Sequence, residues 1–314
     1  MKQHWMFLLI LSILMGGFFS CKNSGARKKN VIIVVIPKFD NTIFDQVKRS
    51  SFEAAKDLNI TVTWEAPTSV DASKQKEIIE NLIAYKVDGI LISCNDVEAL
   101  KEPINAAIKA GIKVATFDSD CPGSDRLFYI GTDNQKAGNV CAKTMLKLYE
   151  KANKNPDQVL ILSGGMSANN LIQRLDGFRD SIGNVKISDV IYSFEISDYG
   201  KELLEYNLNK NSHINGVQMI WGTPVLGGVD SIPSLLKFMN RGGVAVFFDV
   251  SKPLLKYIKN NPNCATMKQD FHSMGYDGVK NLYKAIKGKE VEKQILFDVK
   301  VIDQSNADKE MRNL

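Results

Sequence analysis

The sequence has few of the residues, and none of the short motifs, on which most enzyme mechanisms depend. Its 314 residues contain no GxGxxG dinucleotide fingerprint, no GxxxxGKS or GxxxxGKT phosphate loop and no GxSxG nucleophile elbow. Histidine occurs three times, and only His213 and His272 follow residue 30. The five cysteines form no CxxC pair and no other zinc-binding spacing. These absences leave no recognisable nucleophile, metal site or cofactor loop, so we expect neither an enzyme nor a cofactor.

Concentrated charge is also lacking. The chain has 40 Lys and Arg against 35 Asp and Glu, a net charge of +5, and its basic residues are spread along the sequence. A nucleic-acid-binding surface is therefore not expected. The content of 44% hydrophobic and 24% charged residues is that of an ordinary soluble globular protein, long enough for one large or two medium domains.

The N-terminus differs from the rest of the chain. One Lys precedes the apolar segment MFLLILSILMGGFF, whose 14 residues are fewer than the roughly 20 that a membrane-spanning helix needs. A charged start, a short apolar core and a small residue before Cys21 are typical of a cleaved export signal, and we interpret residues 1–20 as one. An uncleaved membrane anchor is the alternative. Loss of residues 1–20 removes Lys2 and no acid, which lowers the net charge from +5 to +4.

The four residues FFSC resemble the bacterial lipobox, in which a small residue precedes a Cys that is lipidated and becomes the first residue of the mature protein. We therefore predict lipidation at Cys21, although Phe18 stands where the pattern prefers Leu. The residues that follow, KNSGARKKN, are typical of a flexible polar tether, here over 21–30. The protein is expected in the periplasm or cell envelope as a membrane-anchored lipoprotein.

Four cysteines follow the tether, namely Cys94, Cys121, Cys141 and Cys264. An exported protein could pair them, but the spacing does not say which would pair. We favour free, mostly buried thiols.

From residue 31 the sequence alternates between apolar β-rich runs and helical stretches. Alternation of this kind predicts a parallel sheet covered by helices on both faces. The runs lie at 31–36, 60–64, 89–93 and 113–117, with helical stretches near 43–57, 72–85 and 97–110. A second series begins at 158–165, with runs at 189–194, 216–220 and 244–248 and helices near 170–183, 199–209 and 226–240.

The two series match each other. VIIVVIP at 31 corresponds to VLILSGG at 159, VDGILIS at 87 to INGVQMI at 214, and GIKVATFD at 111 to GGVAVFFD at 242, with offsets of 128, 127 and 131 residues. Three matched elements in the same order predict two similar α/β lobes. Asp118 and Asp249 then end the fourth strand of each lobe, directly after a Phe. Because ligands of open α/β sheets bind beyond the carboxyl ends of the strands, both carboxylates are expected to face one cleft.

Each Asp also has a purely structural interpretation. Asp118 begins DSDCPGS, where it could close a turn, and Asp249 precedes VSKPLLKYI, where it could favour the start of a helix. The matched positions favour the binding role.

The residue types near the predicted strand ends suit a small polyhydroxylated ligand. Carboxylates accept strong hydrogen bonds from hydroxyl groups, and Arg174 in NNLIQRLDGF adds a rigid fork of donors. The aromatic rings of Phe39, Phe44, Tyr199 and Trp221 offer faces to the C–H side of a sugar ring. Phe44 could instead pack inside its own helix, since Val47 follows three residues later.

Six motifs in order resemble the type 1 periplasmic sugar-binding proteins, the ribose/galactose-binding group of ABC-transporter receptors. They are NTIFDQV (first-strand loop), VATFDSD (first-lobe Asp strand), YIGTDNQKAG (hinge crossing), RLDGF (ligand-binding Arg helix), VFFDVS (second-lobe Asp strand) and ATMKQDFHSMGYDGV (return crossing). The resemblance covers nearly all of residues 30–303. It implies sugar contacts from Asn41, Phe44, Asp118, Arg174, Asp249 and Gln269, and ring stacking by Tyr199; we add Trp221, which stands at a predicted strand end.

Departures from the family pattern bear on the sugar. Ser119 stands where ribose binders often have Arg, and Gly222 and Thr223, behind Trp221, replace an Asn–Asp pair. Ribose itself is therefore not favoured, and a different pentose, a hexose or a larger ligand is expected.

The resemblance also implies the domain layout. Residues 31–132 with 272–290 are expected to form lobe 1, and 133–271 with 291–314, including a last strand ILFDVKVID, to form lobe 2. Three hinge strands would join the lobes. Ligand would favour the closed state, because only there can both carboxylates reach it.

We therefore expect an exported, monomeric receptor that binds a small sugar between two lobes and delivers it to an ABC permease. The first alternative is a sensor of the same fold that signals to a membrane histidine kinase. A sugar-processing enzyme is disfavoured by the lack of catalytic motifs. A transcriptional repressor with this core is disfavoured because it needs an N-terminal helix-turn-helix of roughly 60 residues where an export signal stands.

Overall fold

Two six-stranded sheets, each flanked by helices, make up the computed structural model, which describes residues 30–314. The predicted export signal 1–20 and lipidation site Cys21 lie outside the described residues. Within the described residues, no helix is long and apolar enough to span a membrane.

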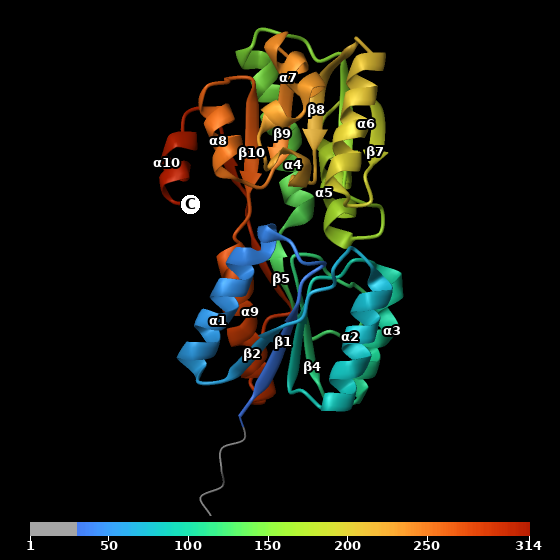
Figure 1. Cartoon of the computed structure of the whole chain (residues 1–314), viewed down its shortest axis with the longest axis vertical. Helices are drawn as coiled ribbons and strands as arrows, with labels where there is room; N and C mark the ends of the chain where they lie inside the picture. Colours follow the sequence, from blue (N-terminus) through green and yellow to red (C-terminus); the bar gives the residue numbers. More distant parts are fainter. Residues whose placement is uncertain (1–29) are drawn as a thin grey trace, which may run out of the picture. The chain divides into compact units, whose positions relative to one another are not determined.

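The first sheet has the strand order β11-β5-β4-β3-β1-β2, and all of its strand pairs are parallel. Its strands are β1 (Ile32–Ile36), β2 (Thr61–Trp64), β3 (Gly89–Ile92), β4 (Lys113–Phe117), β5 (Tyr129–Thr132) and β11 (Gln294–Phe297). Helices α1 (Asp45–Leu58) and α9 (Phe271–Ile286) pack together against it, and α2 (Ala72–Tyr85) and α3 (Val97–Lys109) form a second pair (Figure 1). We call this sheet and its four helices the first lobe.

The second sheet has the order β12-β10-β9-β8-β6-β7, and only its β10–β12 pair is antiparallel. Its strands are β6 (Gln158–Ser163), β7 (Lys186–Tyr192), β8 (Ile214–Met219), β9 (Val244–Phe248), β10 (Cys264–Lys268) and β12 (Lys300–Ile302). Its helices are α4 (Asn134–Lys151), α5 (Asn169–Ser181), α6 (Ser197–Lys210), α7 (Pro233–Asn240), α8 (Lys252–Lys259) and α10 (Ala307–Arg312). We call this part the second lobe. The predicted α/β fold class, with two similar lobes, is confirmed.

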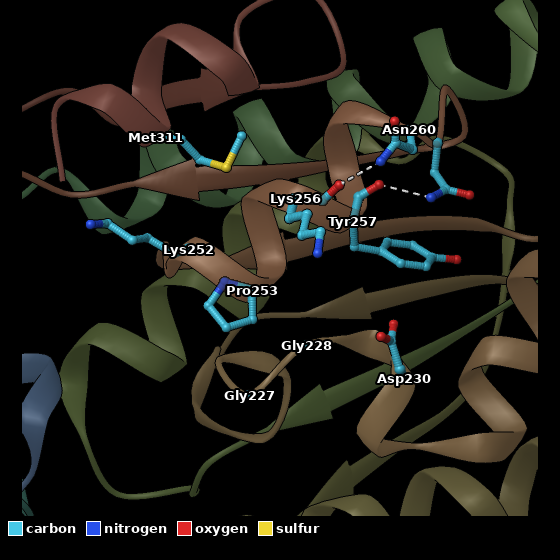
Figure 2. Close-up of a pocket in the computed structure, with 10 residues that line it drawn as sticks. Gly227, Gly228, Asp230, Lys252, Pro253, Lys256, Tyr257, Asn260 and Met311 are labelled. Atoms are coloured by element: carbon cyan, nitrogen blue, oxygen red, sulfur yellow. Dashed lines mark hydrogen bonds between the residues drawn. The ribbon is translucent and has the colours of Figure 1, made fainter.

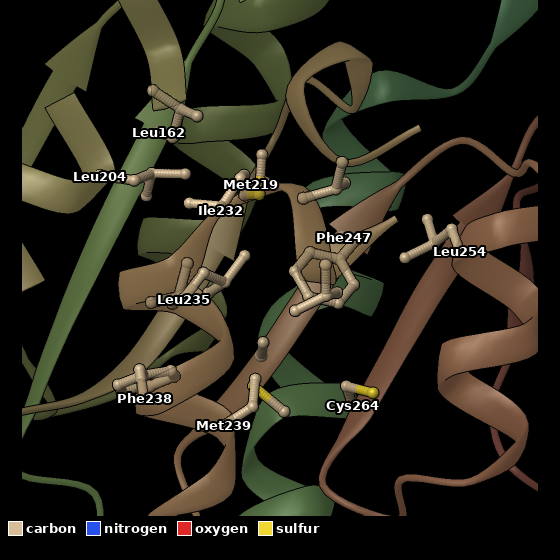
Figure 3. Packing of buried hydrophobic residues seen from close by; sticks show 14 of the residues in the cluster. Leu162, Leu204, Met219, Ile232, Leu235, Phe238, Met239, Phe247, Leu254 and Cys264 are labelled. Atoms are coloured by element: carbon tan, nitrogen blue, oxygen red, sulfur yellow. The ribbon is translucent and has the colours of Figure 1, made fainter. Parts of the chain in front are cut away.

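Each sheet is covered on both faces by its own apolar core, as the unbroken apolar runs of its strands require. In the first lobe, one core lies under α1 and α9 and the other under α2 and α3. In the second lobe, α4 and α5 cover one face, while α6, α7 and α8 cover the other. Figure 3 shows side chains of this last core, among them Leu235 and Phe238 of α7, Phe247 of β9 and Leu254 of α8.

The chain passes between the two sheets three times. It leaves the first sheet after β5 for α4, returns after β10 for α9, and leaves again between β11 and β12. The crossings are bonded to one another: the Asp133 N–H donates to the Phe297 carbonyl (2.9 Å), and the Thr132 hydroxyl donates to Gln269 Oε1 (2.8 Å).

The last strand differs from the prediction. We expected one strand over ILFDVKVID within the second lobe, but Gln294–Phe297 pairs in parallel with β5 of the first sheet, and Lys300–Ile302 pairs with β10 of the second. The first of these segments therefore belongs to the first lobe. The two strands are short and only partly buried. The sequence pattern therefore does not show that the chain changes sheets at Asp298.

Candidate functional site

Asp118 and Asp249 are held in the same way at equivalent strand ends. Both have a left-handed backbone, with φ of 53° and 65°, which Asp tolerates better than most residues. The N–H of each donates to the neighbouring strand, at the Ile130 carbonyl (3.2 Å) and the Met267 carbonyl (2.8 Å).

The carbonyls of the two aspartates are also matched, since each accepts a hydrogen bond from a hydroxyl group on that neighbouring strand. The donors are Tyr129 Oη for Asp118 (2.9 Å) and Thr266 Oγ1 for Asp249 (2.5 Å). The repeat found in the sequence therefore extends to the hydrogen bonds that fix these two residues.

Both aspartates are buried and line one space of about 30 Å³. Residues of both lobes surround this space, which we call the cleft cavity. Its other lining residues are Lys38, Phe39, Ile43, Phe44, Asn170, Leu171, Arg174, Glu195, Trp221, Thr223, Gln269 and Phe271.

A chain of charge-assisted hydrogen bonds runs through the second-lobe side of the cavity. Arg174 Nη2 donates to Gln269 Oε1 (2.7 Å), and Gln269 Nε2 donates to Asp249 Oδ1 (2.8 Å). The guanidinium lies 3.9 Å from the centre of the Phe248 ring and donates from Nε to Asn134 Oδ1 (2.8 Å). Arg174 is thus a buried, rigidly held donor close to the Asp249 carboxylate.

Burial raises the pKa of Asp249 to about 6, although Arg174 and the hydrogen bond from Gln269 act in the opposite direction. The carboxylate is therefore under-compensated in this environment. Further hydrogen-bond donors in the cavity would stabilise its charged form.

On the first-lobe side, the Asp118 carboxylate is shared between the lobes. Oδ2 accepts a hydrogen bond from Ser93 Oγ (2.7 Å) at the end of β3, and Oδ1 accepts one from Asn170 Nδ2 (3.2 Å) of α5. Lys38, two residues after β1, donates from Nζ to Asn170 Oδ1 (3.2 Å) and forms an ion pair with Glu195 (3.0 Å). The Lys38 and Glu195 side chains are only 4% and 5% exposed, so this is a buried ion pair between the lobes.

The aromatic residues Phe44 and Trp221 also line the cavity. Phe44 meets the rings of Phe117 (6.2 Å) and Phe271 (6.1 Å) edge to face, so it belongs both to the first-lobe core and to the cavity wall. Trp221 packs against Ala168 and Leu171. The two interpretations of Phe44 drawn from the sequence are therefore compatible.

Gly222, which departs from the family pattern, is required for a steric reason. A Cβ atom there would lie 1.9 Å from the Phe248 carbonyl oxygen, directly before Asp249. Only glycine fits this close approach of two strand ends, and Thr223 takes a place in the cavity wall instead.

Two of the eight residues expected to contact the sugar, Asn41 and Tyr199, do not line the cavity. The Asn41 side chain accepts a hydrogen bond from the Ile43 N–H (3.0 Å) and caps the short helix Thr42–Phe44, a role that Asn commonly has. Tyr199 is 40% exposed and stacks on Phe194 at 6.5 Å, outside the cavity lining. The other six, Phe44, Asp118, Arg174, Trp221, Asp249 and Gln269, all line the cavity.

Lys38, Asn170 and Glu195 are the polar cavity residues that the sequence analysis missed. Lys38 offered a signal, since it is a charged residue directly after a buried strand and Pro37. Glu195 offered none: it follows β7 in a loop where both Phe194 and Glu195 have a left-handed backbone, with φ of 53° and 56°. That conformation places Glu195 in the buried cleft while Phe194 is 58% exposed.

A larger hollow of about 740 Å³ lies elsewhere on the second lobe, between α8, the loop Gly227–Asp230 and Met311 of α10 (Figure 2). Its lysines, Lys252 and Lys256, are exposed. Its amides bond their own helix, Asn260 at the Lys256 carbonyl (3.1 Å) and Asn261 at the Tyr257 carbonyl (2.7 Å). The charged side chains that line this hollow, Asp230, Lys252 and Lys256, are exposed, whereas Asp118, Arg174 and Asp249 of the cleft cavity are buried. The cleft cavity is therefore the better candidate despite its small volume. Among the described residues no group of His, Cys, Asp and Glu is placed to hold a metal ion.

Comparisons with known proteins identify the family of the chain. Residues 32–290 match the sequence profile of the periplasmic binding protein domain family. The ribose import binding protein RbsB of Bacillus subtilis is 26% identical over 284 residues, which cover 90% of each chain. A solute-binding protein of an ABC transporter from Burkholderia graminis, solved with D-arabinose, is 29% identical, with a TM-score of 0.81 over 88% of this chain and 96% of its own.

A chain of the XylFII–LytSN complex is also 29% identical, with a TM-score of 0.80 over 88% of this chain and 98% of its own. Together these matches confirm the resemblance to type 1 periplasmic sugar-binding proteins. The relatives are substrate-binding proteins and not enzymes, as the absence of catalytic motifs led us to expect.

Proposed function

The chain belongs to the periplasmic binding protein domain family, and from this premise we propose that it binds a small sugar, a pentose or hexose, in the cleft between its lobes and delivers it to an ABC permease. The observation that carries the proposal is the pair Asp118 and Asp249, which face one cavity from equivalent positions in two lobes. Carboxylates in such positions accept hydrogen bonds from several hydroxyl groups.

The hydrogen bonds that now join the lobes mark the groups that a sugar would engage. Asp118 accepts from Asn170, and Lys38 bonds Asn170 and Glu195 across the cleft. The cavity of about 30 Å³ has roughly the volume of one water molecule, which is far less than a sugar ring needs. Sugar entry therefore requires the lobes to separate. Hydroxyl groups of the sugar then replace the hydrogen bonds that these side chains now make across the cleft.

The apolar side of the cavity suits a sugar ring as well. Phe44 and Trp221 offer aromatic surface from opposite lobes, and Thr223 adds a hydroxyl group. The relatives named for ribose import or solved with D-arabinose support a pentose.

A thermal-shift screen of pentoses, hexoses and polyols tests the proposal. At least one sugar should raise the melting temperature, and calorimetric titration should then give one site per chain. Absence of a shift across the whole panel would reject sugar binding.

A second candidate function is sensing. One structural relative is part of a complex named XylFII–LytSN, so a protein of this fold pairs with another protein. In this alternative the closed, sugar-bound form would signal to a membrane histidine kinase instead of feeding a permease. Permease and ATPase genes beside the gene would favour import, and a histidine kinase gene would favour sensing.

We further propose a periplasmic or cell-envelope location, a lipid anchor at Cys21 and a monomeric receptor. Family membership supports the location, and the FFSC pattern supports the anchor. We also keep the proposed lobe limits, 31–132 with 272–290 and 133–271 with 291–314, except that Gln294–Phe297 joins the first lobe.

A further inference from the structure

Two buried cysteines lie side by side behind the Asp118 end of the cleft. Cys94 follows β3 and Cys121 follows β4, and these strands are parallel neighbours with Ile92 beside Thr116. The Cys94 N–H donates to the Ser119 carbonyl (3.0 Å), which joins the two loops that carry the cysteines. Both side chains are 0% exposed and belong to the core under α2 and α3.

The two thiol groups are close enough to shift each other's pKa. Burial raises the pKa of the Cys94 thiol well above its usual value, and the Cys121 thiol adds to this effect. Hydrogen bonding with Cys94 lowers the pKa of the Cys121 thiol. Cys121 Sγ also lies 3.3 Å from the Val97 carbonyl oxygen. Cys121 is therefore the better nucleophile of the two, with Cys94 beside it as the second thiol.

The other two described cysteines are placed differently. Cys141 lies in the core under α4 and α5, while Cys264 lies in the core on the opposite face of the same sheet. All four are free thiols in this structure. Neither Cys141 nor Cys264 has the other as a neighbour, so both serve as internal controls.

We propose that Cys94 and Cys121 form a disulfide bond when the protein folds in an oxidising compartment. The co-reactant is a disulfide-bearing oxidant, which is the class that acts outside the cytoplasm. The Cys121 thiolate attacks one sulfur of the oxidant, and the other half leaves as a thiolate that takes up a proton. The Cys94 thiolate then attacks Cys121 Sγ in the mixed disulfide and releases the second half. Two cysteine S–H bonds and the S–S bond of the oxidant are lost, and one protein S–S bond and two oxidant thiols are formed.

The burial of both thiols determines when the thiol–disulfide exchange can take place. Because both thiols are buried, an oxidant reaches them before the core under α2 and α3 has closed, or during local opening of this region. The protein disulfide then closes a loop that contains α3 and fixes the spacing of the two loops that hold Ser93 and Asp118, whose side chains are 2.7 Å apart.

The test refolds the full chain in a mixture of reduced and oxidised glutathione, alkylates free thiols under denaturing conditions and maps the peptides by mass spectrometry. We expect a linked pair of peptides containing Cys94 and Cys121, with Cys141 and Cys264 alkylated. Cys94→Ser and Cys121→Ser should each abolish the linked pair, and Cys141→Ser should retain it. Alkylation of both Cys94 and Cys121 in the refolded wild-type protein would overturn the proposal.

Thermal melting gives a second readout that does not depend on knowing the sugar. The oxidised wild-type protein should lose roughly 5 °C in melting temperature on addition of dithiothreitol, because the cross-link restricts the unfolded chain. Cys94→Ser should show no such loss. An equal loss in both proteins, or in neither, would overturn the proposal. Neither readout depends on sugar binding, so failure here is distinguishable from failure of the proposed function.

Discussion

Lys38 Nζ lies 3.0 Å from Glu195 Oε1, so a buried ion pair joins the first strand-end loop of one lobe to a loop of the other. A pair of this kind gains little over well-packed apolar residues, but loss of one partner leaves an uncompensated buried charge. The pair is thus suited to hold the lobes together until a ligand provides other partners.

The first prediction concerns this pair. Glu195→Gln should destabilise the unliganded protein by about 3–5 kcal/mol, because Lys38 stays buried without its counter-charge. The melting temperature should fall by roughly 6–10 °C. Lys136→Met is the matched control, since the Lys136–Asp298 pair has side chains 55% and 66% exposed and should contribute less than about 1 kcal/mol. Equal melting of the two variants would contradict a structural role for Lys38–Glu195.

The second prediction concerns the two cleft aspartates. Asp118→Asn and Asp249→Asn keep the side-chain size and a residue that tolerates the left-handed backbone, but they remove the charge. Each should weaken sugar binding by about 10- to 150-fold, which corresponds to a loss of about 1.5–3 kcal/mol per charge-assisted hydrogen bond. Calorimetric titration with the sugar found by screening measures the effect.

Asp125→Asn is the control for that experiment, because Asp125 is an exposed loop residue of the same lobe as Asp118. Its affinity should equal that of the wild-type protein. If both cleft variants also bound with wild-type affinity and merely melted earlier, the aspartates would be structural residues alone.

The third prediction is a pH dependence that arises from Asp249. Its folded pKa of about 6 exceeds the ordinary 3.8, so the folded protein binds the proton more tightly than the unfolded chain does. The resulting stabilisation is complete below about pH 4 and is lost as the pH rises through about 6. The difference amounts to about 3 kcal/mol. In urea unfolding, the free energy of unfolding of unliganded wild-type protein should therefore fall between pH 4 and 7 relative to that of Asp249→Asn. If the two free energies changed with pH in the same way, Asp249 would not be the titrating group.

Sugar binding should show the opposite trend with pH. Hydroxyl donors favour the charged carboxylate, so the ligand should bind more tightly above pH 6 than below it. Titrations at pH 5 and pH 7.5 measure the change. Asp249→Asn should lose this pH dependence, and if it were kept in full another titrating group would be responsible.

The fourth prediction concerns the N-terminus. Mass spectrometry of the membrane fraction should find a lipidated peptide that begins Cys21-Lys22. Cys21→Ser should release the protein from that fraction without changing sugar affinity, because the cleft cavity contains no residue before Lys38. An unmodified mature N-terminus at another residue would reject lipidation.

The fold could be predicted from the sequence because its strands are continuous apolar runs repeated at nearly constant spacing. The same repeat identified Asp118 and Asp249, since the matched strands GIKVATFD and GGVAVFFD place both residues at equivalent strand ends. Arg174 and Gln269 followed from motifs in the expected order.

The rest depended on contacts that no local pattern encodes. Lys38 and Glu195 are 157 residues apart, and they pair only because the lobes meet. Asn41 was assigned to the ligand but caps a helix, which is a competing local role for the same side chain. Tyr199 was assigned to the ring but stacks on Phe194, whose left-handed backbone could not be foreseen in a non-glycine residue.

The three crossings between the sheets also constrain the order in which the protein can fold. The first lobe needs α9 and β11 from the last part of the chain, and the second lobe needs β12, which comes later still. A chain that emerges from a ribosome or an export channel with its N-terminus first can therefore complete neither sheet until nearly all of it has passed. The two lobes therefore complete their sheets at nearly the same time, after the last segments of the chain have become available.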